Sequence, residues 1–482
     1  ANPVQNIKEK DVVTMGGTGG RNRKTMVYST REFQPSDLGI VSGNTVDNGD
    51  VGITAFATNN PRYDTVDGTT FKKDLDKLKP GEALSFIDGL VPDTLMDDAK
   101  RQNFVGIQFG SATSCVGATT TPYRTEQEKF VAHRTSVKHA RVIDKPGKIV
   151  EVLNDHVKIK YDDGEEEAFP LGRWFGPHEG TYYPHTLVTK WKRGDKLPAG
   201  AVITYNEQHF EPDIYDPTQV SFKNGILATV ALIEGEEVIE DSNAISERFA
   251  AKAEADVTKL KEVTMTFTQN LLEMVKEGDH VDVDSILCTF TDNLTGDMSG
   301  FSKEAAETLR ELSSFAPRSG VRGFIDKIEV VYHGEVEDMT PSLAEMVRKY
   351  DRIRRKTALA LKRDEPKDGR VNGDFRVEGV PLAYNSLCVR FYITHRVEMA
   401  AADKMVIANQ LKTTVQEVMY GTNKTEDGQE LDIIFGRDSV DARIVGSIMR
   451  IGTTNAVGYR GGENIGRILD GEDVPALPAK IN

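Results

Sequence analysis

Two adjacent carboxylates, Glu240 and Asp241, are the residues of this chain with the clearest potential for chemistry. They follow the apolar run Gly225-Ile-Leu-Ala-Thr-Val-Ala-Leu-Ile, which is typical of a strand, so they are expected where a strand enters a loop or a helix. Carboxylate oxygens are hard ligands, and a pair of them can approach a divalent cation directly or through water. The alternative is an acidic pair at a helix N-terminus, where negative charge is favourable.

Basic residues form two further candidate groups. Lys404 and Lys412 are eight residues apart, around Met405-Val-Ile-Ala-Asn-Gln-Leu, and considered alone they are two surface lysines. The run Gly16-Gly-Thr-Gly-Gly suits either a loop lying on nucleic acid or an exposed turn, because it precedes three basic residues, Arg21, Arg23 and Lys24.

Several familiar sites are missing from the sequence. The glycine-rich run lacks the Gly-Lys-Ser/Thr ending of a phosphate-binding loop, and no dinucleotide fingerprint follows a strand. The nine histidines form no helical pair or His/Cys cluster, so no zinc site is predicted. Three widely spaced cysteines, at positions 115, 288 and 388, match neither a disulfide framework nor a thiolate site and indicate a reducing compartment.

Most of the elements that must position these residues are predicted to be strands. Residues 129–220 alternate strongly, as in Lys148–Leu153 and His156–Tyr161, and the turn Asp162-Asp-Gly leads to the next strand. Lys192-Arg-Gly-Asp-Lys-Leu resembles Lys276-Glu-Gly-Asp-His-Val, and each predicts a strand, a Gly-Asp turn and another strand. Carrier domains contain similar modules, but neither copy has a carrier-like lysine at its tip, which favours a structural role.

Two stretches are predicted to be helical. Ser246 to Lys276 has apolar residues at helical spacing in its second half, and Pro341 to Arg363 follows Thr340 as an N-cap. The strand Leu387–Val397 comes next, and the proline-containing C-terminus, residues 461–482, is expected to be a loose tail or one that orders on binding.

Composition sets the wider limits. A chain of 482 residues exceeds one hydrophobic core, so two to four domains are expected. It has no apolar run long enough for a membrane span, and its N-terminus lacks a signal-peptide core. The net charge of −15 counts against a simple nucleic-acid coat protein. Residues 348–370 nevertheless include ten basic and four acidic residues. This basic run is either a solvated helix face or a local binding surface.

The order of these signals resembles a known family. Ile239-Glu-Asp-Ser-Asn-Ala-Ile-Ser-Glu-Arg248 is similar to the Tyr-Glu-Asp-Ala-Ile…Ser-Glu-Arg segment of bacterial RNA polymerase β subunits. Asp403–Lys412 resembles their Gly-Asp-Lys-Met-Ala-Gly-Arg-His-Gly-Asn-Lys segment, with both lysines in register. Asp427-Gly-Gln-Glu-Leu-Asp-Ile-Ile-Phe, followed by Ala442-Arg443, is similar to Asp-Gly-Thr-Pro-Val-Asp-Ile-Val-Leu…Ser-Arg.

Two upstream segments follow the same order. Gly19-Gly-Arg-Asn-Arg and Arg31–Gly39 resemble the family's fork-loop region, and Leu90-Val-Pro with Asp97-Asp-Ala-Lys-Arg101 resembles Leu-Ile-Pro-Phe…Asp-Asp-Ala-Asn-Arg. The glycines, Arg and His of the family's two-lysine loop are replaced here, and its C-terminal Phe-Gly-Gly-Gln-Arg segment is missing, which indicates a divergent member.

The resemblance implies a β-rich α+β fold with several domains. Its hybrid-binding domain, containing a double-psi β-barrel, would be interrupted by a flap-like insertion. The expected division is a fork-loop and active-site-facing region (1–120), a hybrid-binding domain (121–271 and 386–460), a flap-like domain (272–385) and a C-terminal tail (461–482). Because the chain starts at the fork, it resembles the C-terminal part of the split β subunits of giant-bacteriophage polymerases.

The resemblance also assigns roles. Nucleotidyl transfer uses two Mg²⁺ ions, and in this family three aspartates of the β′ subunit hold the first, in a motif absent from this chain. The chain is thus expected to be inactive alone. The resemblance implies that Glu240 and Asp241 help to position the second metal through water, and that Lys404 and Lys412 hold the RNA 3′ end. Charge on the triphosphate would be neutralised by Arg101 and Arg443, while Arg21 and Arg23 would line the downstream fork.

The expected partners follow from these roles. They are a β N-terminal polypeptide, β′-type polypeptides with the triple-aspartate motif and a promoter-specificity subunit, together with template DNA, RNA and nucleoside triphosphates. The expected location is the cytoplasm of an infected bacterium or, alternatively, the virion. The rival hypothesis is a β-like scaffold or virion protein that binds nucleic acid or polymerase without contributing catalytic groups.

Overall fold

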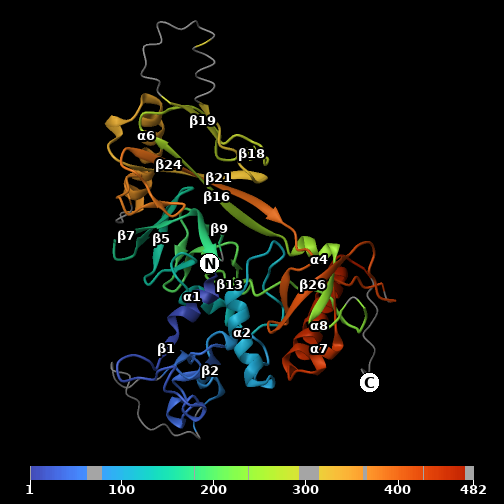
Figure 1. Cartoon of the computed structure of the whole chain (residues 1–482). Coiled ribbons are helices and arrows are strands. Elements are labelled where there is room, and N and C mark those ends of the chain that lie inside the picture. The colour runs from blue at the N-terminus through green and yellow to red at the C-terminus, as the bar shows by residue number, and fades with distance from the viewer. Residues whose placement is uncertain are drawn as a thin grey trace. The chain divides into compact units, whose positions relative to one another are not determined.

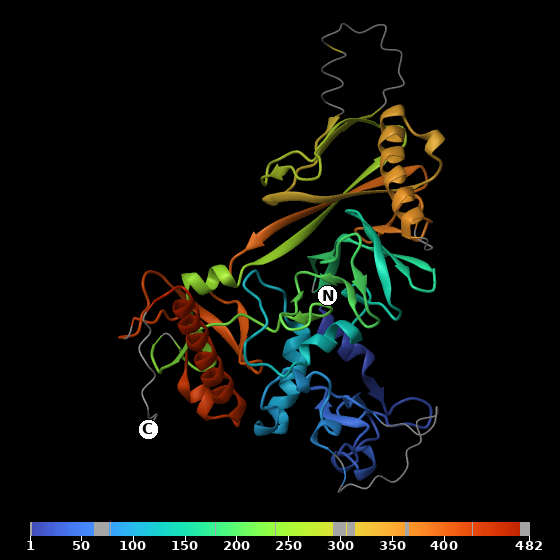
Figure 2. The same ribbon diagram turned by 180° about the vertical axis from the view of Figure 1, so that it is seen from behind.

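The computed structural model describes residues 2–61, 77, 79–178, 180–236, 238–292, 305, 314–361, 366–426 and 428–472 (Figures 1 and 2). The chain divides into two compact units. Unit 1 comprises Ala1–Val142, Ala201–Ala255 and Glu398–Asn482, and unit 2 comprises Ile143–Gly200 and Asp256–Val397. The mixture of helices with a larger share of strands confirms the predicted β-rich α+β class.

Unit 1 holds most of the helices. Its helices are α1 (Pro3–Lys10), α2 (Ala99–Ser111), α3 (Glu128–Arg134), α4 (Glu247–Lys252), α7 (Arg437–Asp441) and α8 (Gly446–Leu469). Its strands are β1 (Val12–Thr14), β2 (Val41–Thr45), β3 (Thr54–Ala57), β4 (Ala140–Val142), β11 (Val202–Asn206), β12 (Phe210–Pro212), β13 (Val220–Phe222), β14 (Val230–Leu232), β15 (Ser242–Ser246), β25 (Lys404–Ile407), β26 (Leu411–Met419) and β27 (Ile433–Phe435).

A five-stranded mixed sheet in unit 1 has the order β14-β27-β15-β26-β25. β14 runs parallel to β27 and β15 runs parallel to β26, whereas β15–β27 and β25–β26 are antiparallel. Apolar residues of these strands and of α4 and α8, including Ile245, Phe249, Leu411, Phe435 and Ile448, form one buried cluster. Strands from two distant parts of the sequence therefore share a single core.

Unit 2 is built mainly of strands around one long helix. Its strands are β5 (Gly147–Val152), β6 (His156–Tyr161), β7 (Glu166–Pro170), β8 (Gly172–His178), β9 (Thr181–Val188), β10 (Lys196–Leu197), β16 (Ala255–Thr266), β17 (Asn270–Met274), β18 (His280–Val281), β19 (Cys288–Thr291), β20 (Ser314–Phe315), β21 (Gly323–His333), β22 (Arg376–Val377), β23 (Val380–Pro381) and β24 (Ser386–Val397).

The helix of unit 2, α6 (Pro341–Leu361), packs against the long strands β16, β21 and β24, and Figure 1 shows these elements together. Leu343 and Val347 of α6 join Ile328 and Phe391 in the main core of the unit. The helix begins directly after Thr340, whose hydroxyl donates to the Gln269 carbonyl at 2.6 Å. The predicted helix from Pro341 is confirmed as far as Leu361, and residues 362–365 lie outside the described part of the chain.

The predicted Gly-Asp turns occur twice in unit 2 with the same contacts. In the first, the Gly194 amide donates to the Ile149 carbonyl and the Ile149 amide to the Asp195 carbonyl. In the second, Gly278 donates to Ile325, and Ile325 donates to the Asp279 carbonyl. Both turn glycines have positive φ, 103° and 93°, which favours glycine at these two positions. These shared turn contacts explain the repeat as a structural one, without a role as a carrier domain with a modified lysine.

Each turn is completed by a second glycine on the facing strand. β10 pairs with β5 through Leu197 and Gly147, and β18 pairs with β21 through Val281 and Gly323. A Cβ at Gly147 would come within 2.7 Å of the Lys160 carbonyl oxygen, and one at Gly323 within 2.4 Å of the Thr394 oxygen. We call residues 147–149 with 192–197 the first Gly-Asp module, and residues 276–281 with 323–325 the second.

The helix predicted from Ser246 to Lys276 is wrong. Only α4 is helical, and β16 and β17 occupy most of the remainder. Val263, Met265 and Phe267 are buried at every second position, and the residues between them are exposed, which is the period of a strand. The helical prediction rested on residues such as Phe267, Leu271 and Met274, which recur at helical spacing, whereas the threonines between the buried residues of β16 favour extended backbone.

The other local predictions are confirmed at the level of elements. β5, β6 and the turn before β7 lie where alternation placed them, and β24 matches the strand predicted after residue 386. Helix α8 continues to Leu469, within the range assigned to a tail, and residues after 472 lie outside the described part. Among the described residues, no helix is both long and apolar enough to cross a membrane. The domain boundaries remain a prediction.

Candidate functional site

Glu240 and Asp241 lie immediately before strand β15, not at the start of a helix. The helix N-terminus considered for them is therefore wrong. The Asp241 carbonyl accepts hydrogen bonds from the Thr413 hydroxyl at 2.8 Å and from the Thr414 amide at 3.1 Å, both on β26. Glu240 has a positive φ of 56°, which turns the backbone into the strand. The pair is thus fixed by its main chain, while both side chains are exposed.

Arg443 binds the side chain of Asp241. Its Nη2 lies 2.5 Å and 2.7 Å from the two carboxylate oxygens, and its Nη1 donates to the Ser439 carbonyl at 2.9 Å. The Ser439 hydroxyl in turn donates to the Glu240 carbonyl at 2.7 Å. Two residues that are 202 positions apart, each singled out from the sequence, therefore form one ion pair whose arginine is mostly buried.

Arg101 belongs to the same electrostatic cluster. It lies in the first turn of α2, where its amide donates to the N-cap side chain of Asp98 at 2.8 Å. Partial burial lowers the pKa of the Arg101 guanidinium, and the neighbouring Arg443 cation lowers it further, while Asp98 and Asp241 act in the opposite direction. Two like charges near one carboxylate form a region with capacity to bind a further anion.

Lys404 and Lys412 project from one face of the β25–β26 hairpin. Lys404 pairs with Thr414, and Lys412 lies two residues before Thr414 on the same strand. Diagonal neighbours of this kind are roughly 7–8 Å apart in an antiparallel pair. Both lysines are exposed, and within the described residues neither ammonium group has a hydrogen-bond or ion-pair partner. Thr414 also pairs with Ser242 of β15, so the hairpin adjoins the Asp241 side of the sheet.

We refer to Arg101, Glu240, Asp241, Lys404, Lys412 and Arg443 as the β15 cluster. All six lie in unit 1, on α2, on the β15 approach, on the β25–β26 hairpin and after α7. Arg443 and Asp241 form an ion pair, Arg101 is within their electrostatic influence, and the lysines are related to them through the sheet.

The loop between the two lysines is held by a buried network that the sequence did not reveal. Gln410 donates to the Asp97 carboxylate at 2.8 Å and to the Ser447 hydroxyl at 3.0 Å. Ser447 donates to Asp97 from both its amide, at 2.9 Å, and its hydroxyl, at 2.6 Å. Ala408 and Asn409 both have positive φ, so the hairpin keeps a left-handed turn without glycine. The only sequence signal was that Asp97 and Gln410 lie in two of the segments that resemble RNA polymerase β subunits, Asp97–Arg101 and Asp403–Lys412.

Arg248 has a structural partner. Its guanidinium lies 2.7 Å from the Asp432 carboxylate and also contacts Glu430. Asp432 is almost fully buried and accepts a further bond from the Thr229 amide at 3.0 Å. The two resemblance segments that contain Arg248 and Asp432 are thus joined by an ion pair. Asp427, the first residue of the downstream segment, lies outside the described residues.

Arg21 and Arg23 lie apart from the β15 cluster in sequence, in the chain between β1 and β2. Arg21 donates to the Gly52 carbonyl at 2.7 Å, and Arg23 forms an ion pair with Asp50. The Asp50 hydrogen bond is the main cause that raises the pKa of Arg23. Both guanidinium groups therefore contribute to the local loop structure, and contact with nucleic acid would have to compete with these interactions.

The acidic pair alone is a poor metal site. Within the described residues, no group of three or more His, Cys, Asp or Glu side chains could hold a metal ion. Both oxygens of Asp241 contact Arg443, and Glu240 is the carboxylate of the pair without a partner in the described chain. One unengaged and exposed carboxylate fits an outer contact to a cation held mainly by other groups.

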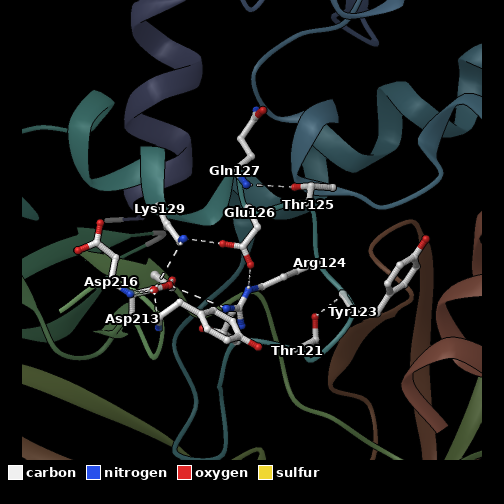
Figure 3. Close-up of polar contacts among 12 residues, drawn as sticks. Thr121, Tyr123, Arg124, Thr125, Glu126, Gln127, Lys129, Asp213 and Asp216 are labelled. Atoms are coloured by element: carbon white, nitrogen blue, oxygen red, sulfur yellow. Dashed lines mark hydrogen bonds and ion pairs between the residues drawn. The ribbon is translucent and has the colours of Figure 1, made fainter. Parts of the chain in front are cut away.

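A second polar cluster was missed by the sequence reasoning (Figure 3). Arg124 is largely buried, contacts Glu126 at 2.9 Å and approaches Asp213 at 3.9 Å. Asp213 accepts from the amides of Tyr215 and Asp216 and from the Ser221 hydroxyl. Since its acceptors are used within the β12–β13 loop, this cluster fixes that loop against α3 and is structural in character.

No family model matched the chain, and no match was found among curated proteins.

Proposed function

We propose that this chain is the C-terminal part of the β subunit of a multisubunit DNA-directed RNA polymerase and supplies the β side of its active site. The observation that carries the proposal is the β15 cluster. Residues chosen because they match separate segments of that family are brought together by one sheet, with Arg443 bound to Asp241 and Arg101 beside them. Chance similarity between unrelated segments gives no reason for such convergence.

In this role, the cationic residues act on phosphate. Lys404 and Lys412 project from one face without partners in the described chain and hold the RNA 3′ end and neighbouring phosphates. Arg101 and Arg443 neutralise charge on the triphosphate of the incoming nucleotide, for which a planar guanidinium is suited. Asp241 orients Arg443 through both of its carboxylate oxygens.

Mg²⁺ would supply activation of the RNA 3′ oxygen and neutralisation of the triphosphate, with its main ligands on a β′-type partner. Glu240 and Asp241 would contribute outer contacts through water. The chain is accordingly proposed to be catalytically inactive alone, and its partners to include a β N-terminal polypeptide and polypeptides with the triple-aspartate motif.

We also propose that the five-stranded sheet of unit 1 is part of a double-psi β-barrel. The support is its mixture of parallel and antiparallel pairs and its origin in two distant segments. β14 and β15 come from residues 121–271, and β25, β26 and β27 come from residues 386–460, which are the two parts expected for the hybrid-binding domain.

The first experiment is co-purification of the tagged chain from infected cells or virions, with identification of the associated proteins. A partner containing the triple-aspartate motif is the expected result. Association only with proteins that lack this motif would contradict the proposal.

The second experiment measures nucleotide addition by the assembled enzyme with Lys412→Ala. Removal of one fixed cation from the phosphate site is expected to lower the rate on the order of 100-fold, with assembly unchanged. Lys259→Ala, which alters an exposed lysine on strand β16, is the matched control and is expected to have the normal rate. An unchanged rate with Lys412→Ala would reject its assigned role.

A non-catalytic β-like scaffold or virion protein is the second candidate. The observation that favours it is the closed ion pair between Asp241 and Arg443, which stabilises the cluster without any ligand. On this alternative, Lys412→Ala leaves the rate of every co-purified polymerase unchanged, and the same rate measurement therefore separates the two functions.

A further inference from the structure

Helix α6 carries a basic face that the β15 cluster does not use. Its sequence has six basic residues and two acidic ones. Five of the basic side chains are exposed and, at 100° per residue, fall within about 120° of the helix circumference. They are Arg348, Lys349, Arg352, Arg355 and Lys356, and we call them the basic face of α6.

The other charges of the middle of α6 are used inside unit 2. Asp351 is buried and accepts from the Tyr332 hydroxyl and the Gly369 amide, each at 2.8 Å. Arg354 donates to the Val330 carbonyl at 2.7 Å. Asp351 is thus turned into the core and is not available to the basic face, and Arg354, which serves the fold, lies on the opposite side of the helix.

The basic face includes one exposed acid, Glu345, three residues before Arg348 and four before Lys349, so its five cations leave a net charge of +4. Within the described residues, none of its five basic side chains forms a hydrogen bond or an ion pair, although Lys349 lies over the Tyr350 ring. Holding five cations together is unfavourable in the free protein, so an anion bound across them relieves that repulsion.

We propose that the basic face of α6 binds the phosphodiester backbone of a nucleic acid. The cations recur over two helical turns, as required for successive phosphates along one strand. An acidic protein surface is a poorer fit, because protein interfaces combine an apolar centre with a polar rim. Here the exposed apolar residues are single side chains, with Ile353 beside the basic face and Leu359 one turn beyond its last cation, and they form no apolar centre.

This inference goes beyond the proposed function because it requires neither catalysis nor a β′-type partner. Because the whole chain has a net charge of −15, the proposal predicts that nucleic acid binds at this face and not over the surface in general. General electrostatic attraction to nucleic acid is not expected from such a chain, so measurable binding must arise from local clusters of positive charge.

The test measures binding of the full chain to a fluorescent 20-nucleotide single-stranded RNA and to a 20-base-pair DNA duplex by anisotropy, over a range of salt concentrations. The variant replaces Arg348, Arg352 and Arg355 by glutamine. Its Kd is expected to rise at least 10-fold for the preferred nucleic acid. Loss of three phosphate contacts should also reduce the salt slope by about 2 for a single strand and nearly 3 for a duplex.

A matched control exists in the same unit. Lys148, Lys259 and Arg376 are exposed and lie on strands of three separate sheets, β5, β16 and β22, so they form no row of adjacent cations. Replacing these three by glutamine removes the same charge, and the Kd is expected to stay within 2-fold of the normal value. Circular dichroism and thermal unfolding establish that both variants are folded.

The measurements with RNA and with duplex DNA identify the ligand and show whether the proposal holds. Tighter binding of RNA or of duplex DNA identifies the class of nucleic acid. No binding of either by the unaltered chain, equal losses in the variant and the control, or a variant that binds normally but loses an acidic protein partner would each overturn the proposal. None of these results depends on polymerase activity, so failure here leaves the proposed function standing.

Discussion

The paired arginines Arg248 and Arg443 of unit 1 and the basic face of α6 in unit 2 use positive charge in opposite ways. In unit 1, Arg443 is bound to Asp241 and Arg248 to Asp432, and each pair links segments that are far apart in the sequence. In unit 2, the basic face of α6 lies on a single continuous helix and has no partner within the described chain. The first arrangement assembles a fold, whereas the second leaves charge available to a ligand.

The difference shows that exposure and pairing carry more information than charge counts. A sequence count finds basic residues in both regions, yet a partly buried arginine beside a carboxylate contributes to stability and orientation. An exposed cation without a partner contributes little to folding. The two regions should therefore respond differently to substitution, and the following predictions are ordered by the size of the expected effect.

The largest effect is expected for Asp432→Ala. This change leaves Arg248 without its buried partner and the Thr229 amide without its acceptor. The free energy of unfolding of unit 1 should fall by about 3 kcal/mol, measured by urea denaturation. Glu430→Ala removes the exposed partner of the same arginine and should lower it by less than about 1 kcal/mol. Equal effects would show that burial does not distinguish the two carboxylates.

A smaller effect is expected for Gln410→Ala. The substitution removes one donor from Asp97 and leaves Ser447 to satisfy that carboxylate. A loss of about 2 kcal/mol in the free energy of unfolding follows from an incompletely satisfied buried acid. Because Gln410 also positions the loop between Lys404 and Lys412, nucleotide addition by the assembled enzyme should slow as well. Normal stability together with normal activity would contradict the role of this network.

Asp241→Asn tests the ion pair that is partly exposed. Its loss should change the free energy of unfolding by less than about 1 kcal/mol, since one partner is half in solvent. Nucleotide addition should fall more than stability does, because Arg443 loses the carboxylate that orients it. The comparison uses denaturation of the isolated chain and single-turnover extension by the assembly. A large loss in the free energy of unfolding would mean that Asp241, like Asp432, mainly stabilises the fold.

The smallest stability effect is expected for the basic face of α6. Glutamine at Arg348, Arg352 and Arg355 should change the free energy of unfolding by about 0.5 kcal/mol or less, and like-charge repulsion makes a slight gain the favoured direction. Thermal unfolding at low and moderate salt measures it. A marked loss would mean that these side chains support the fold, and the contrast between the two units would fail.

Local periodicity predicted much of the fold. The alternation at Lys148 and His156 identified β5 and β6, and the proline at position 341 marked the start of α6. It failed for residues 255–274, where Phe267, Leu271 and Met274 recur at the spacing of one helix face although the segment is extended. The outcome there depends on pairing with strands that are distant in the sequence, and periodicity carries no information about those partners.

The candidate site was predicted in part for a similar reason. Glu240, Asp241 and Arg443 stood out because they match segments of a family, but their ion pair could not be read from positions 202 residues apart. Gln410 and Ser447 are ordinary polar residues in the sequence. Their importance arises only when the fold buries them around Asp97, and the same is true of Arg124 beside Asp213.

The sheets that contain the two Gly-Asp modules differ in when a ribosome would deliver their strands. The first draws its strands from residues 147–197, so its sheet can close as soon as that short stretch has emerged. In the second, β21 is made well before β24, its neighbour in the sheet, which ends at Val397. At 5–20 residues per second, β21 waits roughly 3–13 s with an open edge, which is the interval of synthesis most exposed to mispairing between nascent chains.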